Sequence, residues 1–180
     1  MFRLPNKSVY ALFVLLLLPA LVHGYQRDPL LEVQLHAEFI SLKQADSEAI
    51  ALQHADRIWK LWFQSGDEEV DRLMQEAMAR RRAYDFNGAL ESINRVIELA
   101  PEYPEAWNQR ATVHFFQQEY EKSLQDIART LELEPRHFGA LAGRALIRLN
   151  QLKPALARQN VIEAMNYHPY LPERKLFPGL

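Results

Sequence analysis

Residues 101–135 read PEYPEAWNQRATVHFFQQEYEKSLQDIARTLELEP, which is two amphipathic runs between two prolines. Pro135 follows Pro101 by 34 residues, and Pro169 follows Pro135 by 34 more. Other positions keep the same step and stay alike in size, namely Ala77, Ala111 and Ala145; Ala89, Ser123 and Ala157; and Ile93, Ile127 and Val161. A fixed period of this length is typical of a solenoid of repeated helix pairs.

The apolar periodicity and the turn residues predict helices throughout residues 30–167. In the first section they run from about 30 to 43 and from Asp46 or Ser47 to Gln64, with Asp28 and Pro29 starting the first and Gly66 ending the second. Within the periodic section we expect helices over 68–84, 88–99, 104–116, 120–133, 137–149 and 154–167. The prolines of the period end each second helix, because proline cannot extend one.

The second unit carries the residues by which the chain resembles the tetratricopeptide repeat (TPR) family: Trp107, Ala111, Tyr120, Ser123, Ile127 and Pro135. That family has a 34-residue unit with the pattern W-x2-L-G-x2-Y…A-x3-F…P. The resemblance covers Val70 to about Pro172. The sequence departs from the pattern at three places, with Glu76, Arg110 and Arg144 in place of Leu, Arg80, His114 and Arg148 in place of Tyr, and Ser123 in place of one Ala. The resemblance implies an all-α, right-handed α-solenoid of about three repeats with an N-terminal helical pair.

We divide the chain into residues 1–24, 25–66, 67–172 and 173–180. The first segment has two cations, an apolar run from Tyr10 to Leu18, a helix-breaking Pro19 and small or apolar residues up to Gly24, which is the layout of a secretory signal peptide. The alternative is an uncleaved anchor, the single route by which we expect the chain to meet a membrane. The protein is therefore expected to be exported, to a periplasmic or extracellular location, and resemblance to exported repeat proteins suggests a bacterial source.

Residues 25–66 do not match the repeat pattern. Ala55 and Trp59 nevertheless lie 34 residues before Ala89 and Ile93, so the pair is expected to be a degenerate repeat or an N-terminal cap. Its Trp59 and Trp62 are expected to pack against the first full repeat.

The last repeat precedes a tail, residues 173–180, that is too rich in proline and glycine for a full capping helix. Leu156, Ile162 and Met165 would then be partly uncovered. Either the tail folds back over them or another chain covers them, and the second case predicts a homodimer.

Composition and motifs exclude most chemistry. The chain has no cysteine and a net charge of −2, and it contains neither GxGxxG nor GxxxxGK[ST]. Its histidines form no HxxxH or HExxH pair. We therefore expect no enzyme activity, metal site or cofactor, and no nucleic-acid partner.

Binding is the function that remains, since stacked helix pairs form an extended concave face. The resemblance implies that the first helix of each unit builds this face, which predicts a site made of Met74, Met78, Arg81, Arg82, Asn108, Thr112, Phe115, Phe116, Leu146 and Asn150. The Lys/Asn/Arg clamp that some family members use for a peptide carboxylate is missing, because the corresponding positions are Met74, Met78, Thr112, Gly139 and Gly143.

The cluster from Arg80 to Arg82 has two interpretations. At a helix end it would complement the helix dipole, and at the groove edge it would anchor an acidic group. The expected function is a non-catalytic adaptor or scaffold that holds a protein or peptide partner. The alternative is a structural protein that self-associates through its C-terminal repeat face.

Overall fold

The computed structural model describes residues 27–180, and all regular structure among them is helical. The first helices are α1 (Pro29–Lys43) and α2 (Glu48–Trp62). The three repeats are α3 (Glu68–Arg82) with α4 (Phe86–Leu99), α5 (Pro104–Phe116) with α6 (Tyr120–Leu133), and α7 (Phe138–Asn150) with α8 (Pro154–Met165). A short 3₁₀ helix, η1 (Pro172–Leu176), follows. The predicted leader, residues 1–24, lies outside the described residues.

The helix ends follow the local chemistry of the sequence. An Asp28 carboxylate oxygen accepts from the Leu30 N–H at 2.9 Å, and Pro29 occupies the first turn. Gly66 has a φ of +86°, and Asp67 after it accepts from the Glu69 and Val70 N–H groups. The expected helices are confirmed to within two residues at nearly every end.

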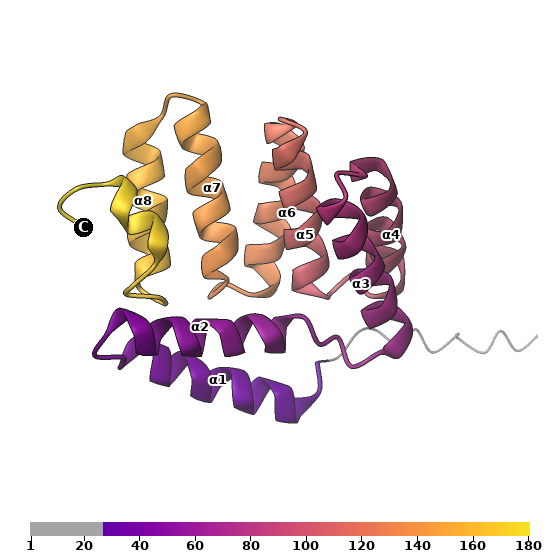
Figure 1. The fold of residues 1–180 in the computed structure, drawn as a ribbon, viewed down its shortest axis with the longest axis horizontal. Coiled ribbons are helices and arrows are strands. Elements are labelled where there is room, and N and C mark those ends of the chain that lie inside the picture. The colour runs from indigo at the N-terminus through magenta and orange to yellow at the C-terminus, as the bar shows by residue number, and fades with distance from the viewer. Residues whose placement is uncertain (1–26) are drawn as a thin grey trace, which may run out of the picture.

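The three helix pairs stand side by side as a solenoid, which confirms the predicted all-α fold (Figure 1). Small residues at the period sit where paired helices touch: Ala77, Ala89, Ala111, Ala145 and Ala157 are at most 2% exposed. A larger side chain at such a position would overpack the contact, at a cost of about 1–3 kcal/mol. Ser123 fits among them because its hydroxyl donates to the Ala111 carbonyl at 2.7 Å.

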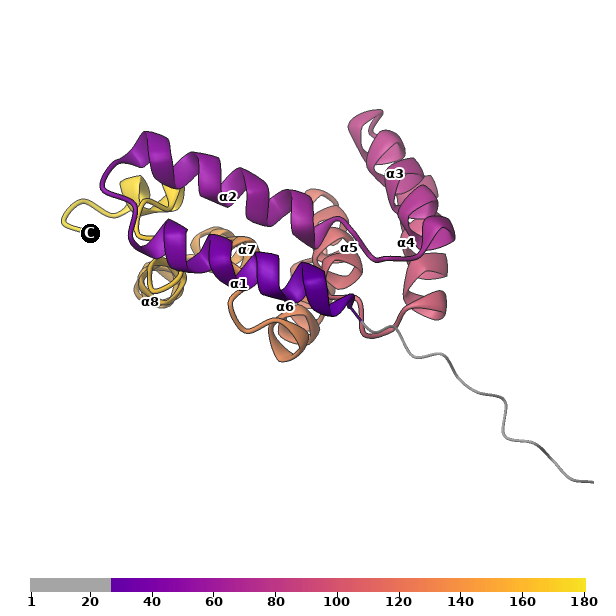
Figure 2. The ribbon, with the colours of Figure 1, turned by 90° about the horizontal axis from the view of Figure 1, so that it is seen from below.

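The α1–α2 hairpin does not continue the stack. It lies crosswise beneath the lower ends of α5 to α8 (Figure 1), and the view from below shows it covering α6, α7 and α8 (Figure 2). Apolar residues of both hairpin helices share one core with the last repeat: Leu35, Phe39, Leu42, Ala51, Ile58 and Trp62 pack with Phe138, Leu141, Ala145, Ala157 and Val161. The hairpin therefore buries its apolar stripe against the far end of the chain.

The expectation that the two tryptophans pack on the first repeat is wrong. The Trp62 ring is stacked on His137, with centroids 3.9 Å apart and planes 6° apart, and Trp59 meets Phe138 edge-on at 5.7 Å. Both contacts are with residues at the start of the third repeat. The physical reason is that α2 crosses the ends of the repeats, so its aromatic face reaches α7 and passes by α3.

The segment after α8, residues 166–180, which we call the tail from here on, folds back on the same core. Leu171 is buried, and Tyr170, Phe177 and Leu180 pack against the hairpin cluster, as Met165 does. Lys175 and Arg174 reach Glu48 at the start of α2, at 2.7 and 3.6 Å. Of the three residues expected to be uncovered, Met165 is partly buried against this core, whereas Leu156 and Ile162 stay 44% and 39% exposed.

Three residues adopt the left-handed backbone at the same repeat position, namely Tyr84, Gln118 and Leu152, with φ of +61°, +62° and +57°. In this conformation, the steric strain on a residue with a Cβ costs about 1–2 kcal/mol. Glycine adopts this conformation without the steric cost but loses about 0.5–1 kcal/mol in chain entropy.

We therefore predict that Leu152→Gly, at a side chain 88% exposed, stabilises the protein by about 0.5–1 kcal/mol. Urea unfolding followed by circular dichroism measures the change. Leu152→Ala is the control, because it removes the same side chain but keeps the Cβ, and its stability should stay near that of the parent. Equal effects of both variants would contradict the explanation.

Candidate groove between the repeats and the hairpin

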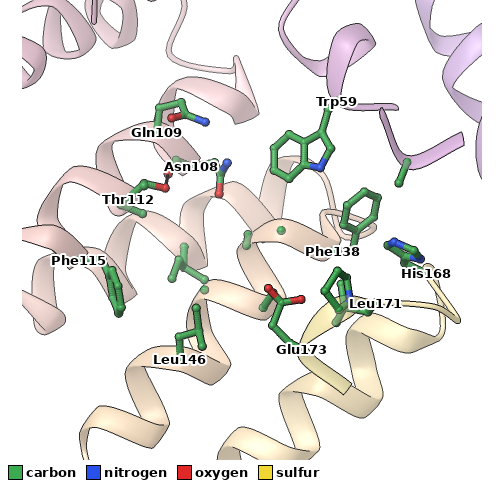
Figure 3. Close-up of a pocket in the computed structure, with 18 of the residues that line it drawn as sticks. Trp59, Asn108, Gln109, Thr112, Phe115, Phe138, Leu146, His168, Leu171 and Glu173 are labelled. Atoms are coloured by element: carbon green, nitrogen blue, oxygen red, sulfur yellow. Dashed lines mark hydrogen bonds between the residues drawn. The ribbon is translucent and has the colours of Figure 1, made fainter. Parts of the chain in front are cut away.

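A cavity of about 650 Å³ occupies the concave side of the solenoid (Figure 3). Its walls are the first helices of the three repeats, α3, α5 and α7. Helix α2 closes one side and the tail closes one end. We call this space the groove.

Seven of the ten residues predicted as the site line the groove: Met78, Arg81, Asn108, Thr112, Phe115, Phe116 and Leu146. The other three do not. Met74 is 1% exposed and packs in the core with Val70 and Tyr103, so a ligand cannot reach it. Arg82 is exposed at the end of α3, and the Asn150 amide donates back to the Leu146 carbonyl at 2.9 Å. Met74 lies one turn before the groove residue Met78, Asn150 lies one turn after Leu146, and Arg82 is the exposed neighbour of Arg81.

Sequence reasoning missed the part of the groove that lies outside the repeats. Helix α2 contributes Leu52, Ala55, Asp56, Trp59 and Phe63, and the tail contributes His168, Leu171, Pro172 and Glu173. The aromatic run from Trp59 to Phe63 indicated a contact surface on this helix, but the sequence does not show which repeat that surface packs against.

Gly139 at the start of α7 allows α2 to come this close. A Cβ at this position would collide with the Trp59 ring. The absence of a side chain thus lets Trp59 lie against α7 and form the groove wall.

A buried polar network lies behind the groove wall and centres on Glu105, which is 1% exposed. Its carboxylate accepts from His137 Nε2 at 2.9 Å, from the Asn108 amide at 3.2 and 3.3 Å, and from the Gln109 amide. His137 Nδ1 accepts from the Ala140 N–H at 3.1 Å, which leaves the proton on Nε2 for Glu105. The network therefore satisfies a buried carboxylate and caps α7 at the same time.

Within the arginine cluster, Arg80 has the helix-end role and Arg81 lies at the groove. Arg80 is tied to Glu76 at 2.7 Å and to Asp85 at 3.3 Å, which is a helix-end role. Arg81 turns into the groove, and its Nη1 donates to the Gln109 side-chain oxygen at 2.7 Å. Burial lowers the pKa of Arg81, while the charge of Glu105 acts in the opposite direction.

The tail end of the groove holds a second unusual group. Burial, with the nearby positive charge of Arg174, lowers the pKa of His168 to about 4. Its Nδ1 is buried and has no hydrogen-bond partner. His168 is therefore neutral in the folded protein near pH 7.

Residues 27–180 contain no group of three or more His, Asp or Glu side chains that could hold a metal ion. Within the same residues, no helix has the length and apolar character needed to cross a membrane.

We predict that Glu105→Ala destabilises the fold by about 2–4 kcal/mol, because three buried donors lose their acceptor. Glu105→Gln should cost less than half of that, since its carbonyl oxygen still accepts. Urea unfolding at neutral pH measures both variants. A loss below about 1 kcal/mol for Glu105→Ala would show that water satisfies the donors instead.

The lowered pKa of His168 predicts a stability change with pH. Between pH 6.5 and about 4 the unfolded chain binds a proton that the folded chain does not, so stability falls as the pH drops through this range. His168→Gln should flatten this part of the profile of unfolding free energy against pH. His36→Gln, at an exposed position of α1, is the control and should leave the profile unchanged.

No family model matches the sequence. A TPR repeat-containing protein of Rhizobium etli is 39% identical over 112 residues, which are 62% of this chain, and the chain spans 55% of that relative's length.

Two solved structures share the fold. The first TPR domain of Spaghetti (RPAP3), bound to the HSP90 peptide SRMEEVD, has a TM-score of 0.56 at 16% identity over 61% of this chain and 90% of that one. MamA has a TM-score of 0.52 at 15% identity over 81% of this chain and 80% of its own. With three stacked helix pairs at a 34-residue period, the chain has the fold of the tetratricopeptide-repeat proteins, and over 112 residues it is similar to a TPR protein at 39% identity.

Proposed function

We propose that the protein is a non-catalytic adaptor that holds a peptide segment of a partner protein in the groove. The observation that carries this proposal is the groove itself, a cavity of about 650 Å³ with mostly apolar walls on the concave side of the repeats. Aromatic side chains from three separate elements face it, namely Trp59, Phe115 and Phe138 (Figure 3). Such surfaces bind by burying apolar side chains of a ligand, at about 25 cal/mol per Å² removed from water.

Two further points support a peptide as the ligand. The TPR domain of Spaghetti, which shares the fold, binds an HSP90 peptide in its solved structure. In this chain, Asn108 and Thr112 also line the groove, and their side-chain oxygens can accept hydrogen bonds from the backbone of an extended segment.

The chemistry of the groove supports binding without turnover. Its buried carboxylate and imidazole, Glu105 and His137, are fully engaged with one another and with neighbouring amides. A general base must be able to reach a proton of the substrate, and neither group presents a free lone pair to the groove.

We also propose that residues 1–24 direct export of the protein, on the strength of their sequence layout. Mass spectrometry of the mature chain from its native host tests this point. Export by a signal peptide predicts a chain that starts shortly after Gly24.

The adaptor proposal predicts that Leu146→Glu and Phe115→Glu abolish binding of peptides selected from a random phage-displayed library against the parent chain. A carboxylate in the apolar wall would be buried by any ligand without a partner. Leu152→Glu is the matched control, because Leu152 is exposed outside the groove and should leave binding unchanged. Fluorescence anisotropy of labelled peptides measures affinity, and circular dichroism checks that each variant is folded. Selected peptides that bind all folded variants equally would overturn the groove as the site.

A further inference from the structure

Two charged side chains facing the groove form no direct ion pair in the described part of the chain. Arg81 is the single Lys or Arg among the residues that line the groove, and residues 27–180 place no carboxylate within 4.0 Å of it. Glu173 lines the other end, and no Lys, Arg or His of the described residues lies within 4.0 Å of its carboxylate. The third charged residue of the lining, Asp56, is paired with Lys60 at 2.6 Å.

These two charges lie at opposite ends. Arg81 belongs to α3 and Glu173 follows α8, the helices at the two ends of the solenoid (Figure 1). In the close-up, the Glu173 carboxylate points into the cavity, and Gln109, which holds Arg81, lies across it (Figure 3). The groove is therefore positive at the α3 end and negative at the tail end, with apolar walls between.

The Arg81 guanidinium is held ready for an anion. Within residues 27–180 its one hydrogen bond goes to a neutral oxygen, that of Gln109, at 2.7 Å. The Gln109 amide nitrogen donates to Glu105, and this fixes which end of the amide faces Arg81. Glu105 cannot itself pair with Arg81, since its oxygens already accept from His137, Asn108 and Gln109. A half-buried cation without a counter-ion is costly, and a carboxylate from a ligand would remove that cost through a charge-assisted hydrogen bond.

We propose that the groove takes a short apolar peptide segment in one direction, with a carboxylate of the segment bound by Arg81 and a cation of the segment facing Glu173. This inference rests on the proposed function and adds the charge pattern and the direction of the ligand. It does not use the family's clamp positions, which in this chain are Met74, Met78, Thr112, Gly139 and Gly143.

The same display library tests the proposal. Peptides selected on the parent chain should combine apolar residues with an acidic residue toward one end and a basic residue toward the other. For such a peptide, Arg81→Gln should weaken binding at least about tenfold, as expected for the loss of one charge-assisted contact. Arg82→Gln is the matched control, because Arg82 is the next residue, is exposed and does not line the groove.

A double-mutant cycle identifies the contact. Replacing the acidic residue of the peptide by its amide should cost as much as Arg81→Gln, and the two changes together should cost little more than either alone. Glu173→Gln should weaken only those peptides that carry the basic residue. Circular dichroism confirms that each variant is folded, and Arg81→Lys keeps the charge and should retain part of the affinity.

The outcomes separate this inference from the adaptor proposal. Peptides that depend on Leu146 but show no acidic preference, or that bind Arg81→Gln as tightly as the parent, would overturn the charge-directed binding and leave the adaptor proposal intact. Peptides that bind independently of Leu146 and Phe115 would overturn both.

Discussion

The stack of His137 on Trp62 joins the two ends of the molecule. It brings α2, from the start of the chain, against the first turn of the third repeat, with ring centroids 3.9 Å apart. Tyr103 reinforces the joint from the second repeat by donating its hydroxyl proton to the Trp62 carbonyl at 2.8 Å. This joint lies where the hairpin, the groove wall and the Glu105 network meet, because Trp62 neighbours the wall residue Trp59 and His137 donates to Glu105. The aromatic contact and the polar network behind it are thus parts of one structure.

Ion pairs of the outer edge hold the start of the hairpin in the same position. Arg136 pairs with Glu134 and with Glu32 of α1, and Arg27 pairs with the same two carboxylates. Burial alone would raise the pKa of Glu134, but the hydrogen bonds and charges of Arg136 and Arg27 lower it below its usual range. Lys175 and Arg174 anchor the other end of the hairpin at Glu48. Neither the partly exposed pairs at Glu48 nor the pairs at the buried Glu134 are strong evidence of stability, so we assign to them the register of the hairpin and assign its stability to the buried core.

The helix ends and the stacking of neighbouring helix pairs could be predicted from the sequence, because they depend on local or periodic features. Helix ends such as Asp28–Pro29 and Gly66–Asp67 are determined by backbone chemistry within a few residues, and the 34-residue period determines how neighbouring pairs stack. Seven of the ten residues that the resemblance to the TPR family predicts as the site line the groove. The position of the hairpin could not be derived in this way. The apolar stripes of α1 and α2 require burial, but several faces of a solenoid offer it, and the choice is made by long-range contacts such as Gly139 with Trp59. Glu173 and His168 were missed for the same reason, because their place in the groove depends on how the tail folds.

The crosswise hairpin also changes the mechanical character of the array. An open stack of helix pairs can deform elastically, because each unit contacts only its neighbours and can rotate slightly against them. Here residues 29–62 cross the lower ends of α5 to α8 and pack against the last repeat, which limits how far these units can rotate against one another. The opening of the concave side is then held at one width before any partner arrives, and little conformational entropy is lost on association. Under a pulling force, such a molecule should resist until the brace detaches and then give way in a single event, in contrast to the unit-by-unit extension of an unbraced array.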